Sequence, residues 1–199
     1  MKLLNETSSS REKILSAGQR LIAARGFSSV GLTEILSEAK VPKGSFYHYF
    51  DSKESFGEAL LDRYFEAYMA DVDEMMSRSG STMARRLIGY FEGWHEHQAF
   101  ADLEGRCLAV KLGAEVSDLS EAMRLALKRG TAEIIQRLAF AIKAGAEEKS
   151  LAVDGDAKVI AENLYSLWLG ASVMVKILRN ETPLDAAMTT TKAILHIDS

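Results

Sequence analysis

Cys107 is the residue best suited to covalent chemistry in this chain, because it is the only cysteine and basic side chains flank it. Arg106 is its neighbour and Lys111 follows four residues later. Positive charge lowers the pKa of a thiol, and the thiolate is the reactive form. A lone cysteine is also commonly an inert, buried apolar residue, so the sequence leaves both roles open. A single cysteine excludes an intramolecular disulfide, although not a disulfide between two subunits.

Lys176 is a second unusual residue, since it interrupts the apolar stretch SLWLGASVMVKILRN. A lysine in apolar surroundings needs a partner, and it can itself become a nucleophile. An enzyme would pair Cys107 with His95 or His97 as base. The sequence offers neither an oxyanion hole nor an orienting acid, so we expect no enzyme. The two histidines, two residues apart on a helix, are poorly placed to share a zinc ion with Cys107, and we expect no metal or other cofactor.

Aromatic residues suggest a different kind of sensing site, a pocket for a small apolar ligand. Helical spacing also places Tyr90 beside Trp94 and His97. Aromatic residues at such spacing are more often part of the ordinary core. The candidate pocket residues are Phe91, Trp94, Phe100, Tyr165 and Trp168.

The segment VPKGSFYHYF, residues 41–50, has the composition of a short recognition helix. Phe46 and Phe50 lie four residues apart on one helical face, with Tyr49 beside them, and we expect these three rings to pack inward. The opposite face then presents polar groups, and a recognition helix uses its N-terminal part to contact base edges and phosphates. The outward residues are Lys43, Ser45, Tyr47 and His48, and Lys53 is placed for a second phosphate contact.

The elements that must position these residues are predicted to be helices. Pro42 and Pro183 are the only prolines, and prolines break helix interiors. The apolar share of 47% can supply a sizeable core. The longest uncharged apolar run, Leu164 to Val175, is too short to span a membrane, which needs about 20 residues. The first residues contain no apolar core long enough for a signal peptide, so we expect none. We therefore expect an all-α, cytoplasmic protein with no membrane partner.

Charge divides unevenly along the chain. Residues 1–60 carry a net charge of +1, whereas the remaining 139 residues carry −5. This asymmetry mildly favours nucleic-acid binding by the N-terminal part. The sequence thus predicts a helix-turn-helix domain over residues 1–54, followed by a helical sensing and dimerisation domain over residues 55–199.

Helix boundaries follow from apolar periodicity and from capping residues. Ser8 or Ser9 caps the first predicted helix, Thr33 the second, and Asp51 or Ser52 the fourth. Gly26 is expected to end the first helix in a left-handed conformation, with Phe27 packing back. The predicted helices are Ser9–Arg25, residues 34–40, Lys43–Phe50, Lys53–Ser77, Thr82–Gln98, Glu104–Ala114, Leu119–Glu148 (capped by Ser117 or Asp118), Asp156–Arg179 and Leu184–His196.

The N-terminal segment closely resembles the DNA-binding domain of TetR-family regulators. The resemblance runs without a gap over about residues 10–58, through RGF (25–27), GLTEIL (31–36), VPKGSFYHYF and SKE (52–54). It implies a three-helix domain whose third helix enters the major groove, in a dimeric repressor that binds a palindromic operator. The DNA contacts that it implies are Thr33, Lys43, Gly44, Ser45, Tyr47, His48 and Lys53.

The C-terminal part resembles one subgroup of that family, the N-ethylmaleimide-responsive repressors, through GRCLAVKLGAEVSDLSE and LYSLWLGASVMVKI. This resemblance implies that Cys107 senses electrophiles or oxidants, with Lys176 as its basic partner. The alternative is a non-covalent small-molecule inducer in the aromatic pocket.

The last two helices are expected to form the homodimer interface, as they usually do in this family. Their apolar stripe consists of Ile160, Leu164, Leu167, Trp168, Ala171, Val175 and Leu178. The same stripe could instead pack within the subunit.

Overall fold

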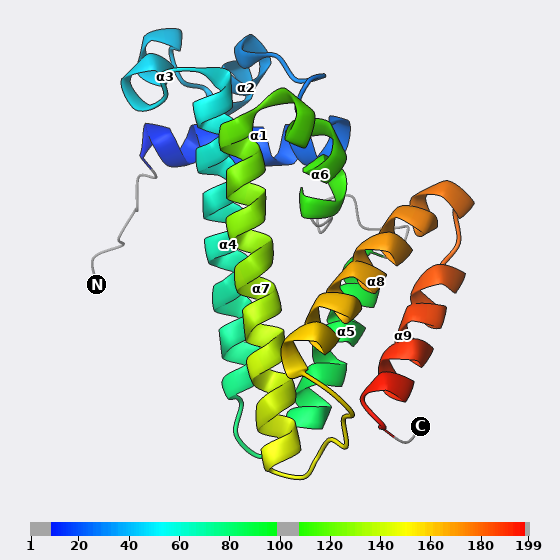
Figure 1. Ribbon diagram of the computed structural model, residues 1–199. Coiled ribbons are helices and arrows are strands. Elements are labelled where there is room, and N and C mark those ends of the chain that lie inside the picture. Colours follow the sequence, from blue (N-terminus) through cyan, green and yellow to red (C-terminus); the bar gives the residue numbers. More distant parts are fainter. Residues whose placement is uncertain (1–8, 99–107, 198–199) are drawn as a thin grey trace, which may run out of the picture.

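The computed structural model describes residues 9–98 and 108–197, and these residues fold into nine helices without a strand (Figure 1). The predicted all-α fold is therefore confirmed. The helices are α1 (Ser10–Arg25), α2 (Leu32–Ala39), α3 (Lys43–Tyr49), α4 (Lys53–Ser77), α5 (Met83–Gln98), α6 (Leu108–Leu119), α7 (Glu121–Glu147), α8 (Ala157–Leu178) and α9 (Thr182–Ile194).

Two long helices, α4 and α7, run side by side in the same direction and form the spine of the molecule (Figure 1). Helices α1–α3 form a small head at one end of the spine, and α5, α8 and α9 pack around its other end. Ion pairs bridge the two long helices: Arg129 contacts Asp62 at 2.9 Å, and Arg137 contacts Asp73 at 2.8 Å. The head is thus joined to the body by a continuous, laterally braced helix.

Gly130 allows α4 and α7 to approach each other closely. A Cβ atom built at Gly130 would lie 2.1 Å from Cγ of Phe65, an apolar side chain buried on α4. Phe65 cannot easily yield, because the atoms in conflict belong to a ring packed in the core. The contact therefore requires the absence of a side chain at position 130.

Alanine at position 130 is expected to lower the free energy of unfolding. Overpacking a core costs about 1–3 kcal/mol, whereas the higher helix propensity of alanine returns about 1 kcal/mol at most. Gly89→Ala is the matched control, because none of the described residues lies within 4 Å of a Cβ at this helical position. Urea unfolding followed by circular dichroism should show Gly130→Ala below wild type and Gly89→Ala at or above it. Equal stability of the two variants would contradict the close packing.

Capping residues begin two helices as predicted. The Ser9 side chain accepts a hydrogen bond from the Glu12 amide, and Ser52 forms a reciprocal capping box with Ser55 at the start of α4. Gly26 has a positive φ of 92° at the end of α1, as predicted, but its ψ of 163° is extended rather than left-handed helical. Phe27 is buried behind it.

The predicted starts of α2 and α7 and the predicted end of α6 are wrong. α2 begins at Leu32 after Gly31, so Thr33 lies inside the first turn instead of capping it. Ser120, rather than Ser117 or Asp118, caps α7 and accepts a hydrogen bond from the Met123 amide. α6 continues to Leu119, five residues beyond the predicted end. Burial of Leu112 and Val116 keeps α6 helical through this stretch.

Within the part of the chain that the structure describes, no helix is both long and apolar enough to cross a membrane.

Candidate nucleic-acid interface and sensing segment

An aromatic cluster holds α3 against the rest of the head. Phe46 is fully buried, and its ring lies 5.2 Å from the ring of Phe50 and 5.8 Å from that of Phe56 at the start of α4. The Phe50 and Phe56 rings meet edge to face at 5.3 Å. Such aromatic contacts contribute orientation as well as buried area. The inward direction predicted for Phe46 and Phe50 is confirmed.

The opposite face of α3 points to solvent. Tyr47 is 55% exposed, Lys43 and His48 are exposed, and Ser45 is half-buried. The prediction for Tyr49 was wrong: it is 38% exposed, and its ring lies against His48 at 4.8 Å. Phe46 and Phe50 already fill the inner face, and Tyr49 is the last residue of a short helix, so its phenol stays at the edge.

Gly44 lies on this exposed face in the first turn of α3. No described residue lies within 4 Å of a Cβ built at this position, so the packing of the protein does not require glycine there. The absence of a side chain leaves the α3 backbone open to close approach by another molecule. Thr33 is exposed in the first turn of α2.

Lys53 has an intramolecular role in addition to the predicted phosphate contact. Its ammonium donates a hydrogen bond of 2.8 Å to the carbonyl oxygen of Phe27 and lies 4.4 Å from the centroid of the Phe27 ring. A cation above an aromatic ring is attracted to its face. Lys53 thereby ties the start of α4 to the loop after α1, and the phosphate contact stays a prediction.

Glu115 on α6 reaches into the head, which sequence reasoning missed. Its carboxylate accepts hydrogen bonds from the amides of Phe27 at 3.1 Å and Ser28 at 2.7 Å. Partial burial raises the pKa of this carboxyl. The Ser28 amide and hydroxyl, the Phe27 amide and nearby Lys111 outweigh that effect and hold the pKa below its usual value. Glu115 is 88 positions from Phe27 and 87 from Ser28 in the sequence, and no local pattern predicts contacts over such separations.

Of the two predicted sensing residues, Lys176 lies within the described part of the chain. Cys107 lies outside the described residues, directly before the first residue of α6. Lys176 is half-buried near the C-terminal end of α8. Their proximity therefore stays a prediction.

Four of the five predicted pocket residues pack against one another in the body. The ring of Trp168 stacks on Phe91 at 5.1 Å, and Trp94 contacts Tyr165 at 5.5 Å. Both indole N–H groups are bonded, Trp94 to Ser172 at 3.0 Å and Trp168 to Thr191 at 2.9 Å. Among the described residues these rings belong to the core, and Phe100 lies outside that part of the chain.

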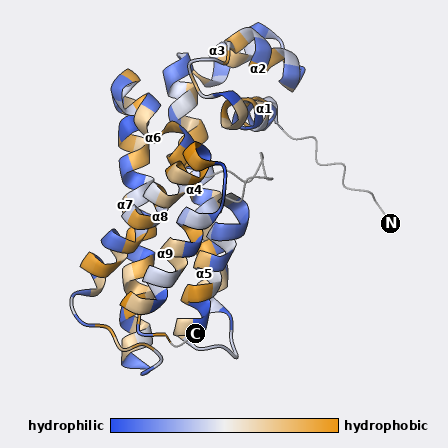
Figure 2. Cartoon of the chain, turned by 90° about the vertical axis from the view of Figure 1, so that its right-hand side faces the viewer, coloured by the Kyte–Doolittle hydropathy of each residue, from blue (hydrophilic) through white to orange (hydrophobic). Residues whose placement is uncertain are grey.

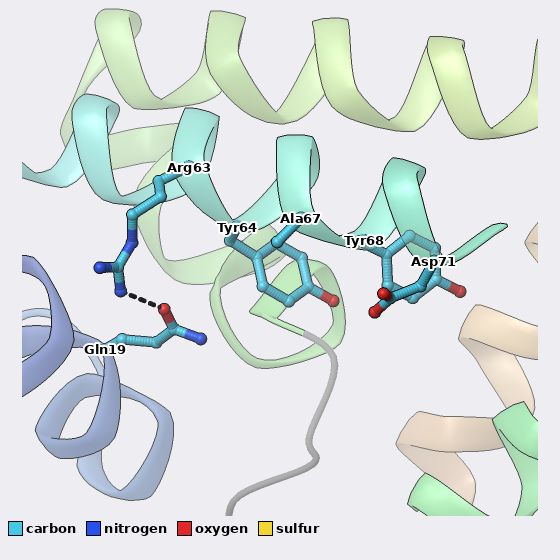
Figure 3. Close-up of a pocket in the computed structure, with 6 residues that line it drawn as sticks. All are labelled: Gln19, Arg63, Tyr64, Ala67, Tyr68 and Asp71. Carbon is cyan, nitrogen blue, oxygen red and sulfur yellow. Dashed lines mark hydrogen bonds between the residues drawn. The ribbon is translucent and has the colours of Figure 1, made fainter. Parts of the chain in front are cut away.

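Two cavities lie elsewhere in the described structure. The first, of about 440 Å³, lies beside α1 and α4 and is shown in Figure 3. Arg63 donates a hydrogen bond of 2.7 Å to Gln19 at its edge. The second, of about 410 Å³, lies between α5 and α9. The first is lined by Gln19, Arg63, Tyr64, Ala67, Tyr68 and Asp71, and the second by Glu92, His95, Glu96, Asp185, Met188 and Thr189.

The two histidines of the rejected zinc site have separate partners. His95 contacts Asp185 on α9 at 3.0 Å, whereas His97 bonds the carbonyl oxygen of Gly93 on its own helix. Among described residues, no three His, Cys, Asp or Glu side chains are grouped to hold a metal ion.

The apolar stripe of α8 packs mainly within the subunit, contrary to the role expected for it. Ile160, Leu164, Trp168, Ala171 and Val175 are all buried, because α8 packs against α7 and α9 along this face. Leu167 is half-buried and Leu178 is exposed. Helix α8, which has hydrophobic (orange) segments in Figure 2, carries exposed apolar side chains on a second face. These are Val159, Val173, Met174 and Ile177.

The head has the architecture of a helix-turn-helix DNA-binding domain, and comparisons with known proteins extend this conclusion to the whole chain. Residues 14–60 match the model for bacterial regulatory proteins of the tetR family. Residues 84–191 match the model for the tetracyclin repressor-like C-terminal domain.

Individual relatives cover almost the full length. The chain is 40% identical to the HTH-type transcriptional repressor NemR of Escherichia coli, over 93% of each chain. The crystal structure of the reduced form of E. coli NemR superposes with a TM-score of 0.88 at 42% identity, covering 94% of this chain and 96% of that one. The transcriptional repressor DhaR of a Mycobacterium species is 32% identical over 90% of this chain and 88% of its own.

The chain therefore belongs to the TetR family. It is a helix-turn-helix transcriptional regulator, similar over nearly its whole length to a repressor. Regulators of this family bind DNA operators and act as dimers. Their activity is binding rather than catalysis.

Proposed function

We propose that this protein is a transcriptional repressor that leaves its operator when Cys107 reacts with an electrophile or oxidant. The observation that carries the DNA-binding part is the exposed polar face of α3 on a rigidly anchored head. The sensing part rests on the resemblance around Cys107 and on the relative NemR, whose structure is described as a reduced form. A relative that has a distinct reduced form is consistent with a regulator whose state depends on oxidation.

The DNA contacts come from the exposed face of the head. Tyr47 and His48 read base edges from α3, while Lys43 and the open backbone at Gly44 meet phosphate. Two heads in a symmetric dimer contact a palindromic operator with half-sites about 34–36 Å apart or a multiple of that distance. The complete set of contacts is Thr33, Lys43, Gly44, Ser45, Tyr47, His48 and Lys53.

The homodimer forms through α8 and α9. The exposed apolar residues Val173, Met174 and Ile177 gather in the last turns of α8, and an exposed apolar patch of this kind marks an interface. A two-fold axis would place the same face of α8 from each subunit in contact. This interface uses the outer face of α8, whereas the stripe predicted from the sequence supports the subunit's own core.

The sensing step is an addition to the thiolate. With N-ethylmaleimide, the Cys107 sulfur forms a bond to one carbon of the double bond, and a proton from solvent completes the other carbon. Lys176 is the basic partner that stabilises the thiolate. With hypochlorite, the thiolate takes up chlorine to give a sulfenyl chloride, and the neutral Lys176 amine then displaces chloride and loses a proton to form a sulfur–nitrogen bond. Release follows only if the modified thiol favours a second arrangement of the body and head.

The test is fluorescence anisotropy on DNA from the region upstream of the gene, with wild type and Cys107→Ser. N-ethylmaleimide, a quinone and hypochlorite are each expected to weaken binding of the wild type and to leave Cys107→Ser bound. Mass spectrometry should show one adduct per wild-type subunit.

If both treated proteins, wild type and Cys107→Ser, bound the operator as tightly as the untreated proteins, the thiol switch would be refuted. That result would leave the DNA-binding head intact and direct attention to a non-covalent inducer.

A further inference from the structure

Phe27 is one of the residues that fix the head to the body. Its amide donates to Glu115 on α6, and its carbonyl accepts from Lys53 on α4, whose ammonium also lies over the ring. The Phe27 ring also packs closely against Gly57 on α4. A Cβ built at Gly57 would lie 2.8 Å from the Phe27 ring and 2.5 Å from the sulfur of Met123 on α7. Helices α4 and α6 therefore both contact one residue of the loop between α1 and α2, and Met123 of α7 lies close by at Gly57.

Glu115 is the contact by which α6 takes part in this junction. Leu112 and Val116 on the same helix are fully buried, so α6 is anchored in the core and carries the carboxylate with it. Lys111, one turn earlier, donates a weaker hydrogen bond of 3.4 Å to the carbonyl oxygen of Ala24 near the end of α1. A shift of α6 cannot leave these contacts unchanged, because hydrogen bonds weaken steeply with distance and angle.

Because α6 directly follows Cys107 in the sequence, the contact of Glu115 with the head can couple a reaction at Cys107 to the head. α6 begins at the residue after Cys107 and lies beside the head (Figure 1). Only the loop at residues 26–31 separates α1 from α2, so a displaced Phe27–Ser28 backbone changes how α2 and α3 sit on the spine.

We propose that Glu115 is the positioning residue through which a movement of α6 reorients the DNA-binding head. The proposal rests on the proposed function, since it explains how a reaction at Cys107 reaches the operator. The carboxylate holds the head in its DNA-binding arrangement, and a displaced α6 withdraws it from the two amides.

The chemistry of the contact suits a switch of this kind. Hydrogen bonds to an ionised carboxylate are stronger than neutral ones. The junction is only partly buried, so solvent can replace the carboxylate at the released amides, and the head loses its fixed orientation without unfolding. The depressed pKa keeps Glu115 ionised at neutral pH.

The test compares Glu115→Ala and Glu115→Gln with Asp118→Asn in the full-length protein. Asp118 is an exposed acidic residue on the same helix, and it forms no hydrogen bond to the head within the described structure. Glutamine preserves the shape of Glu115 but removes its charge. It also replaces one acceptor oxygen by an NH2 group, which cannot accept a hydrogen bond from the Phe27 and Ser28 amides. It therefore guards against a loss of folding in the alanine variant.

Two readouts separate coupling from stability. The first is the ratio of operator dissociation constants with and without N-ethylmaleimide, with adduct formation verified by mass spectrometry. Allosteric couplings span about 5–150-fold, and we expect Glu115→Ala to bring the wild-type ratio close to one, with Glu115→Gln intermediate. The second is hydrogen exchange across residues 108–119. Operator binding should slow exchange there in wild type and in Asp118→Asn, but not in Glu115→Ala.

The outcomes distinguish this proposal from the thiol switch. If N-ethylmaleimide leaves wild type bound, the thiol switch fails, and the exchange measurement alone decides the role of Glu115. Operator-dependent protection of α6 that persists in both Glu115 variants would overturn the proposal. Absence of that protection in wild type would overturn it as well.

Discussion

Phe46→Ala is expected to lower the free energy of unfolding by about 3–5 kcal/mol, the usual cost of truncating a fully buried phenylalanine. Phe46 has no exposed surface, and its ring contacts those of Tyr47, Phe50 and Phe56. The cavity would lie between α3 and the start of α4. Operator binding should be lost as well, because α3 would no longer have a fixed position. Urea unfolding by circular dichroism, with anisotropy on operator DNA, measures both effects.

Tyr49→Ala is the matched control for Phe46→Ala. Both residues are aromatic residues of the same seven-residue helix, but Tyr49 is 38% exposed and contacts the ring of His48 at the surface. Substitutions away from the core usually change stability by about 0.5 kcal/mol or less, and we expect at most about 1 kcal/mol here. A Phe46→Ala protein as stable as Tyr49→Ala would contradict the aromatic anchoring of α3.

Local signals in the sequence were sufficient where a helix end depends on its own residues. Ser52 and Ser55 cap the start of α4 by bonding to each other's backbone, and a serine next to a periodic apolar run predicts that cap. Thr33 was wrongly predicted to cap α2 on the same grounds, because threonine is a common capping residue. The chain uses Gly31 instead, whose carbonyl accepts from the Glu34 and Ile35 amides.

The direction in which the α8 stripe packs could not be read from periodicity. An apolar face predicts burial but does not say against what. Here α7 and α9 cover it from within the subunit, and Ile177 and Met174 remain exposed on another face. The sequence contained both faces, and only the positions of the neighbouring helices distinguish core from interface.

The link between α6 and the head was also beyond sequence reasoning. Glu115 lies in the stretch GRCLAVKLGAEVSDLSE that was singled out for Cys107, yet as a charged residue on a helix it would be expected to face solvent. Its partners are backbone amides of Phe27 and Ser28, groups that every sequence contains. Because Glu115 bonds to main-chain atoms, the sequence contains no complementary side chain from which the contact could be predicted.

Tyr47→Ala is expected to weaken operator binding by about 5–150-fold, which is the effect of losing about 1–3 kcal/mol of base contact. The side chain is 55% exposed, and its ring meets the Phe46 ring edge to face at 5.4 Å. Stability should therefore stay within about 1 kcal/mol of wild type. The same substitution should reduce the preference for operator over an unrelated duplex, because base contacts carry the sequence information.

Lys43→Ala separates base reading from phosphate binding on the same helix. A lost phosphate contact should weaken binding to operator and unrelated DNA alike, and it should reduce the slope of log affinity against log salt by about one. Anisotropy titrations at four salt concentrations on both duplexes distinguish the two variants. If Tyr47→Ala kept wild-type discrimination between the duplexes, the exposed face of α3 would serve to position the head on the phosphate backbone. The reading of bases would then have to come from His48 and from the first turn of α2, where Thr33 is exposed.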